Sequence, residues 1–176
     1  MLDDNRIKEA ERNVREYLQS GMLEKHKPDK DIEKVLLDNS KDSIEIADFL
    51  AENKRSDLWI IVTSYYSMFY MANAVLLRAG FKVGDKIPHK VTADALIVFV
   101  RDKLKKSIIE EYEEAQIEAL PGIKADEIID EFDKERRKRG ILQYETTQIE
   151  KHSKAITSLN RAKSFLFEME KLMEIP

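Results

Sequence analysis

The sequence predicts an all-α protein, an antiparallel bundle of five to seven helices. The 176 residues include only five Gly and four Pro, too few for the frequent turns of an all-β fold. Apolar residues recur at intervals of three and four along most of the chain, which is typical of amphipathic helices. The length favours a single domain, and the absence of Cys excludes disulfide scaffolds and thiolate sites.

Each expected helix has an apolar stripe, with a polar cap or a breaker at its ends. Asp3 or Asp4 can cap the first helix, and Gly21 ends it. Ser56 or Asp57 can cap the third helix in the same way. The expected helices cover residues 3–21, 31–53, 57–80, 88–99, 108–119, 128–140 and 147–176.

The segments between these helices follow from breakers and caps. Residues 81–90 are expected to form a loop, with Pro88 at the start of the next helix. Pro121 and Gly122 are expected to end the fifth helix. Thr147 and Glu150 match a capping box that opens the last helix.

The third helix contains a run of 20 uncharged residues, from Leu58 to Leu77. This run is long enough to cross a bilayer. However, it carries several hydroxyl groups and an amide, which favour a helix buried among other helices. Tyr66, Tyr70 and Asn73 follow at intervals of four and three, so they share one face. That face is either part of a tyrosine-lined core or a binding cleft.

The sequence lacks the motifs that are typical of metal sites and cofactor sites. The residues three positions before the histidines are Leu23, Lys86 and Ile149, so the Glu-x-x-His pattern of helical di-metal sites is missing. Gly-rich phosphate loops and nucleophile elbows are missing as well. We therefore expect no metal and no cofactor.

A basic run from Lys134 to Arg139 includes Arg136 and Arg137 and precedes Tyr144. Arg makes bidentate contacts with phosphate, and aromatic rings stack on bases, so the run is a candidate nucleic-acid site. The alternative is a solvated helix end whose positive charge favours the helix dipole. A net charge of −4 offers no basic surface over the chain as a whole.

Three strings carry a resemblance to a known family: TSYYSMFYMANAVLLRAGF, KIPHKVTADALIVFV and RKRGILQYETT before a final helix. Together they resemble the HEPN superfamily, and most closely its small prokaryotic members, over residues 31–176. Residues 1–21 look like an added helix on a single HEPN-like domain covering residues 1–176. The resemblance implies a helical bundle that forms a homodimer. It also implies a metal-independent ribonuclease or toxin, paired with a minimal nucleotidyltransferase as antitoxin.

The family motif of Arg followed by His falls on Arg139 and Tyr144. The loop histidine of the closest group falls on His89, and its helix tyrosines fall on Tyr66 and Tyr70. Tyr has an ordinary pKa near 10 and is a poor base at neutral pH, whereas His is suited to proton transfer. The phosphate-binding half of the motif is therefore present, and the proton-transfer half is replaced.

The sequence thus predicts a cytoplasmic HEPN-type protein that binds RNA or a nucleotide. The expected catalytic positions are Arg139, Tyr144 and His89, and the expected ligand-binding positions are Tyr66, Tyr70, Asn73, Arg136 and Arg137. Two alternatives stay open. One is a non-catalytic module that binds a protein partner, and the other is an active metal-independent endoribonuclease toxin.

Overall fold

The structure is a computed structural model that describes residues 2–127 and 148–174. It contains six α-helices and a two-stranded sheet over these residues, so the predicted all-α bundle is confirmed. The helices are α1 (Asp4–Ser20), α2 (Lys30–Glu52), α3 (Asp57–Arg78), α4 (Pro88–Phe99), α5 (Lys106–Glu127) and α6 (Gln148–Glu174). The helix expected over residues 128–140 lies outside the described part of the chain.

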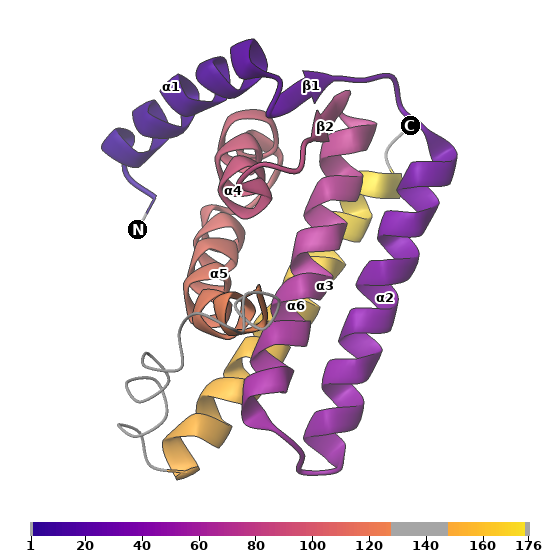
Figure 1. Cartoon of the computed structure of the whole chain (residues 1–176), viewed down its shortest axis with the longest axis vertical. Coiled ribbons are helices and arrows are strands. Elements are labelled where there is room, and N and C mark those ends of the chain that lie inside the picture. The colour runs from indigo at the N-terminus through magenta and orange to yellow at the C-terminus, as the bar shows by residue number, and fades with distance from the viewer. Residues whose placement is uncertain (1, 128–147, 175–176) are drawn as a thin grey trace.

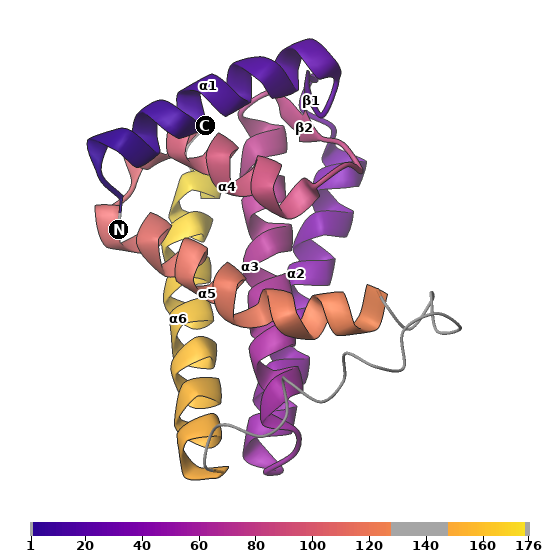
Figure 2. The ribbon, with the colours of Figure 1, turned by 60° about the vertical axis from the view of Figure 1, so that its left-hand side comes forward.

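Helix α3 lies at the centre of the bundle, with α2, α5 and α6 packed against it (Figure 1). The chain reverses between α2 and α3, whereas α6 runs in the same direction as α3. Two contacts between α3 and α6 fix that direction. His152 pairs with Asp57 where both helices begin, and Arg78 donates to the carbonyl of Met173 where both end. Helix α1 crosses over α4 at one end of the molecule (Figure 2).

Local signals place most helix ends where the sequence predicts them. The Asp3 side chain accepts a hydrogen bond from the Arg6 amide at 2.8 Å, and Gly21 ends α1 with a φ of +75°. The Ser56 hydroxyl caps α3, and Pro88 is the first residue of α4. The cap of α2 is Asp29, whose carboxylate accepts from two backbone amides.

Two expectations about the segments between helices are wrong. Residues 81–90 do not form only a loop, because Phe81–Val83 (β2) pairs antiparallel with Leu23–Lys25 (β1). Three-residue strands are too short to show a period of their own, and the Phe81 ring is held by stacking on Phe99 at 3.8 Å between centroids. Helix α5 also continues through Pro121 and Gly122 to Glu127. A proline removes one backbone hydrogen bond, and a long helix can continue past that loss.

The core is built mainly from α3, twelve of whose residues are buried. By length and hydropathy, α3 is the one described helix that could cross a membrane, and 67% of its most apolar stretch is buried inside the protein. A helix that is apolar on nearly all sides is typical of the centre of a bundle. A second, smaller core joins α2, α3 and α6 through Ala47, Ile60, Ala155 and Leu159.

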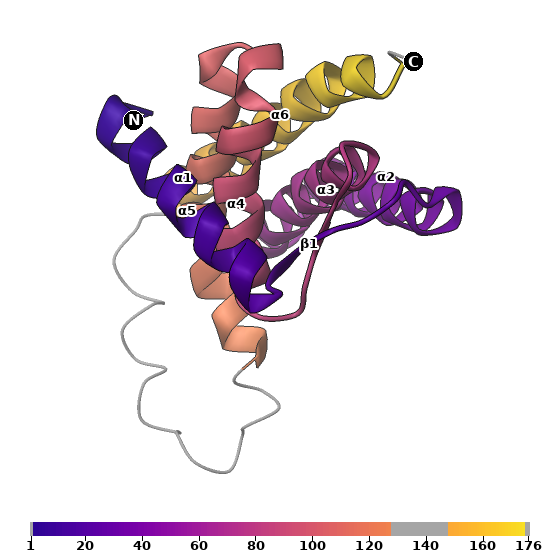
Figure 3. The ribbon, with the colours of Figure 1, turned by 90° about the horizontal axis from the view of Figure 1, so that it is seen from above.

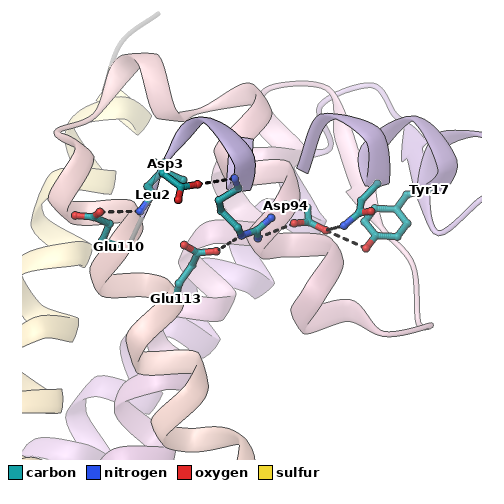
Figure 4. A network of polar contacts seen from close by, with 8 residues as sticks. Leu2, Asp3, Tyr17, Asp94, Glu110 and Glu113 are labelled. Carbon is teal, nitrogen blue, oxygen red and sulfur yellow. Dashed lines mark hydrogen bonds and ion pairs between the residues drawn. The ribbon is translucent and has the colours of Figure 1, made fainter. Parts of the chain in front are cut away.

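Three side chains of α1 converge on one fully buried carboxylate of α4, that of Asp94 (Figure 4). Its Oδ2 accepts hydrogen bonds from the Asn13 amide at 3.0 Å and from the Tyr17 hydroxyl at 2.9 Å. Its Oδ1 lies 2.7 Å from the Arg6 guanidinium, an ion pair without the angles of a hydrogen bond. Arg6 also donates from Nε to Glu113 of α5 at 2.7 Å. These five residues are hereafter the Asp94 clamp.

Arg6 is the one cation of the Asp94 clamp and lies between two carboxylates, those of Asp94 and Glu113. Burial alone would lower the pKa of Arg6, but its contacts with Asp94 and Glu113 raise that pKa overall. Burial, followed by the charge of Asp94, raises the pKa of Tyr17, so its hydroxyl stays protonated and donates. The clamp therefore joins α1 to both α4 and α5 through a charged arginine and a neutral tyrosine.

Candidate functional site

One side of α3 carries tyrosines and an amide that are only half-buried: Tyr66, Tyr70 and Asn73. The rings of Tyr66 and Tyr70 stack, with centroids 5.8 Å apart and an angle of 28° between their planes. The shared face that the spacing of these residues predicts is therefore present for the two tyrosines.

His89 lies beside these tyrosines, although it belongs to α4. Its Nδ1 is 2.9 Å from the Tyr65 hydroxyl, and its ring centroid is 4.5 Å from that of Phe69 and 6.0 Å from that of Tyr66. Ile87, two residues before His89, has a φ of +43°, a left-handed conformation immediately before α4 begins at Pro88. His89, Tyr65, Tyr66, Phe69 and Tyr70 are hereafter the His89 cluster.

The Tyr65 hydroxyl orients the imidazole. Tyr65 is fully buried, and burial raises its pKa, so the hydroxyl keeps its proton at neutral pH. It can donate to Nδ1 of a neutral imidazole or accept from a protonated one. In both states the hydrogen bond restrains the rotation of the ring, which is how the second nitrogen of a functional histidine is aimed.

Tyr112 of α5 supports Tyr65 from the other side, with ring centroids 5.9 Å apart. It is fully buried, and burial together with the neighbouring Tyr65 raises its pKa well above the ordinary value. The Tyr112 hydroxyl nevertheless has no partner with hydrogen-bond geometry among the described residues.

Asn73 was expected to bind a ligand, but its amide is engaged within the protein. Its Nδ2 donates to the carbonyl of Phe69 at 2.8 Å and to the Thr92 hydroxyl at 3.2 Å. Thr92 is fully buried on α4. Asn73 therefore connects α3 to α4 beside the His89 cluster and helps to hold the two helices in register.

Four of the expected site residues cannot be placed against this cluster. Arg136, Arg137, Arg139 and Tyr144 lie outside the described residues. The structure thus brings together His89, Tyr66 and Tyr70 from the expected site, and it leaves their relation to the basic run as a prediction.

Sequence reasoning assigned no role in the site to Phe69, Tyr112 or Thr92. Phe69 is four residues after Tyr65 and so faces the same side of α3, which is a signal the sequence does contain. Tyr112 is an aromatic residue in an otherwise acidic segment, which is a weaker signal. Nothing in the sequence pairs Thr92 with Asn73.

The other two histidines lie elsewhere. The backbone amide of His26 donates to Gly80 next to the small sheet, and the His152 ring pairs with Asp57 at 2.9 Å. Within residues 2–127 and 148–174, no three His, Asp or Glu side chains converge as ligands for a metal ion. His26 and His152 are therefore suitable control positions when His89 is substituted.

No protein-family model, curated protein or solved structure matches the chain. Functional inference therefore rests on the chemistry of the side chains. In the described part of the chain, the His89 cluster combines an oriented imidazole with two stacked, half-exposed phenol rings. Such a group can stack on a base, donate to a phosphate or exchange a proton near neutral pH.

Proposed function

We propose that the chain is an RNA- or nucleotide-binding protein of the HEPN type, which holds a base at the His89 cluster and phosphate at the basic run ending in Arg139. One observation carries the proposal. His89 lies 19 residues beyond Tyr70 in sequence, yet its ring contacts Tyr66, on which Tyr70 stacks. The two tyrosines and the histidine that the family resemblance singles out are thus neighbours in space.

Stacking supports a nucleobase as the ligand. Tyr66 and Tyr70 are half-buried, so part of each ring is open to solvent. A base stacked on an aromatic side chain gains about 1–3 kcal/mol, with little dependence on base identity. Arg139 and its neighbours add charge that can pair with the phosphates on either side of that base.

A second candidate function is metal-independent RNA cleavage. It is favoured by the hydrogen bond from Tyr65, which orients the imidazole of His89 at 2.9 Å. Cleavage needs a group that removes the proton of the 2′-hydroxyl near pH 7, and histidine has a suitable ordinary pKa. His89 would then take the part that Tyr144, at the family's histidine position, cannot perform well.

Binding is tested by fluorescence anisotropy with a labelled single-stranded oligoribonucleotide. We expect His89→Gln to weaken binding at least tenfold, while His26→Gln and His152→Gln stay within twofold of the wild type. Tyr66→Leu should cost about 1–3 kcal/mol of binding free energy if a base stacks there. Phe167→Leu is its control, since Phe167 is an exposed aromatic residue on α6. Equal losses in Tyr66→Leu and Phe167→Leu would contradict the proposed site.

The phosphate contacts are tested with two triple variants of identical charge. One replaces Arg136, Arg137 and Arg139 by Ala, and the other replaces the exposed Lys8, Arg12 and Arg15 of α1. We expect only the first variant to reduce the salt dependence of binding, by about 0.7 in the log–log slope for each lost phosphate contact. Equal slopes in the two variants would show that charge acts only at long range.

Cleavage is tested on the same oligoribonucleotide in the presence of a chelator. If the wild type cleaves the oligoribonucleotide and His89→Gln does not, the protein is a ribonuclease that uses His89. Binding without cleavage would support the first proposal. If the protein neither binds nor cleaves the oligoribonucleotide, the result would favour the remaining alternative. That alternative is a non-catalytic module that binds a protein, such as the nucleotidyltransferase implied by the resemblance.

A further inference from the structure

A line of lysines follows the small sheet and the segments on either side of it. Residues 24–30 and 81–90 contain six lysines and three acidic residues, so they carry a net charge of +3 in a chain whose net charge is −4. All six lysines are exposed: Lys25, Lys27, Lys30, Lys82, Lys86 and Lys90. These six residues are hereafter the lysine track.

The antiparallel pairing of the two strands sets the order of the lysine track. Lys25 of β1 and Lys82 of β2 lie in its middle. Because the strands run in opposite directions, the chain leaves the sheet toward Lys27 and α2 at one end, and toward Lys86 and α4 at the other. Viewed from above, β1 lies between α4 and the pair formed by α2 and α3 (Figure 3). The track is therefore a line across this end of the bundle and not a compact patch.

The charges of the lysine track are not used in ion pairs within the described part of the chain. One of the three nearby carboxylates, that of Asp29, accepts from two backbone amides as the cap of α2. Residues 101–106 are also basic, but there Arg101 pairs with Asp102 at 3.1 Å and Lys106 with Glu110 at 3.9 Å. The lysine track thus presents positive charge that is free to pair with an external anion.

One end of the lysine track adjoins the His89 cluster. Lys86 and Lys90 flank His89 in sequence, three residues before it and one residue after it. The His89 ring in turn contacts Tyr66, on which Tyr70 stacks. A base that stacks on these rings would therefore have lysines beside its phosphates.

We propose that the lysine track binds the phosphates of a single-stranded nucleic acid whose base is held at the His89 cluster. This inference rests on the proposed function and deepens it, because it makes the ligand a strand of several nucleotides and not a free nucleotide. Lysine pairs with phosphate as a point charge, without the fixed fork of arginine. A row of lysines therefore follows a flexible backbone and positions it without reading its sequence.

The length of the lysine track sets the length of the strand. In the register of the sheet, Lys27 is level with Ala79, which is seven residues before Lys86. At about 3.3 Å per residue, the distance between the two lysines is at most about 23 Å. A strand with about 3.4 Å per nucleotide covers it with about seven nucleotides.

An anionic membrane offers the same phosphate chemistry but fits the lysine track less well. Segments that lie on membranes combine lysines with large apolar residues that enter the lipid. Of the eight large hydrophobic residues that are exposed in the described part of the chain, only Ile87 belongs to residues 24–30 or 81–90. A row of lysines that leads to stacked aromatic rings is instead typical of proteins that bind single strands.

The test compares two triple variants that lose the same charge, each with three exposed lysines replaced by Ala. The distal variant replaces Lys25, Lys27 and Lys82, and the control replaces Lys103, Lys105 and Lys106. Fluorescence anisotropy measures the binding of labelled oligoribonucleotides of about three and about ten nucleotides at low salt. We expect the distal variant to bind the longer one at least tenfold more weakly and the shorter one within threefold of the wild type. The control should stay within threefold for both.

Three outcomes would overturn the lysine track. One is equal loss in the two triple variants, because charge would then act without regard to position. Another is a distal variant that binds the longer oligoribonucleotide like the wild type. The third is a distal variant that loses only its binding to vesicles of anionic lipid. Circular dichroism establishes that the variants are folded, and replacing Lys25, Lys27 and Lys82 by Arg should preserve binding.

His89→Gln separates this inference from the proposed function. If His89→Gln weakens binding at both lengths and the distal variant binds like the wild type, the base site stands and the lysine track is refuted. If the distal variant alone loses the longer oligoribonucleotide, the track stands and the base site is refuted. A wild type that binds neither oligoribonucleotide would refute both.

Discussion

Helix α4 carries two polar sites on opposite sides, and they differ in burial and in the kind of side chain that surrounds them. His89 and Asp94 are five residues apart, about 140° around the helix. Asp94 is fully buried and receives two hydrogen bonds and an ion pair from α1. His89 is half-buried among aromatic rings, with a neutral tyrosine hydroxyl 2.9 Å from its Nδ1.

The difference separates a structural site from a candidate functional one. A buried carboxylate is tolerated only when donors surround it, so the residues of the Asp94 clamp are committed to each other. The His89 cluster is made of an imidazole and aromatic rings, and its outer rings, Tyr66 and Tyr70, are only half-buried. Because α4 carries both sites, the clamp that fixes α4 against α1 and α5 also determines where His89 lies.

The largest expected effect comes from breaking the Asp94 clamp. Arg6→Ala removes the cationic partner of a fully buried carboxylate, which should lower the free energy of unfolding by about 3–5 kcal/mol. Arg12→Ala, at an exposed position of the same helix, should change it by less than about 0.5 kcal/mol. Urea denaturation monitored by circular dichroism measures both. Equal and small effects would mean that the buried carboxylate is neutralised in another way.

A smaller effect distinguishes the two buried tyrosines at the His89 cluster. Tyr65→Phe removes a hydroxyl that is bonded to His89, which should cost about 1 kcal/mol of stability. Tyr112→Phe removes a hydroxyl without a partner of hydrogen-bond geometry, so its effect should be near zero or slightly stabilising. The same denaturation assay compares them. If both cost about 1 kcal/mol, the two hydroxyls are bonded to each other.

Alkaline pH should destabilise the protein through the same two tyrosines. Burial raises the pKa of Tyr65 and of Tyr112 in the folded state, while both titrate near 10 when unfolded. The stability from their neutral forms is complete below about pH 10 and is lost as pH rises toward the folded pKa values. Each tyrosine should contribute a loss of about 1.4 kcal/mol per pH unit above pH 10. The double variant Tyr65→Phe, Tyr112→Phe should unfold with a shallower pH dependence, and an unchanged slope would exclude these residues.

The smallest effect is expected at an ion pair outside both sites. His152 pairs with Asp57 at 2.9 Å, but its side chain is 48% exposed. His152→Gln should therefore change the free energy of unfolding by less than about 0.5 kcal/mol. A loss as large as that of Arg6→Ala would mean that pairing at the surface contributes as much as pairing in the interior.

Much of the fold could be predicted because its signals are local. Asp3, Gly21, Ser56 and Pro88 mark helix ends through contacts within a few residues. The pairing of β1 with β2 could not be predicted, because its partners are about 60 residues apart and each strand has only three residues. Pro121 misled the prediction because a breaker has only a statistical effect on the end of a helix.

The candidate site was predictable in part for the same reason. Tyr66 and Tyr70 are four residues apart on one helix, so their shared face follows from the helical period. The contact of His89 with Tyr65 joins two helices, and no spacing within either helix encodes it. Asp94 is a charged residue in an apolar stretch between Val91 and Val98, which is visible in the sequence. Only the structure explains why it is there, because its three partners lie on α1.

By itself the sequence determined a helical bundle, most of its caps, the tyrosine face of α3 and the basic run as a candidate phosphate site. These features depend on interactions over one or two helical turns. Only the tertiary structure decided that His89 meets the tyrosines and that Asp94 binds α1. Those relations depend on how helices pack, which is set by the burial of the whole core and not by any short segment.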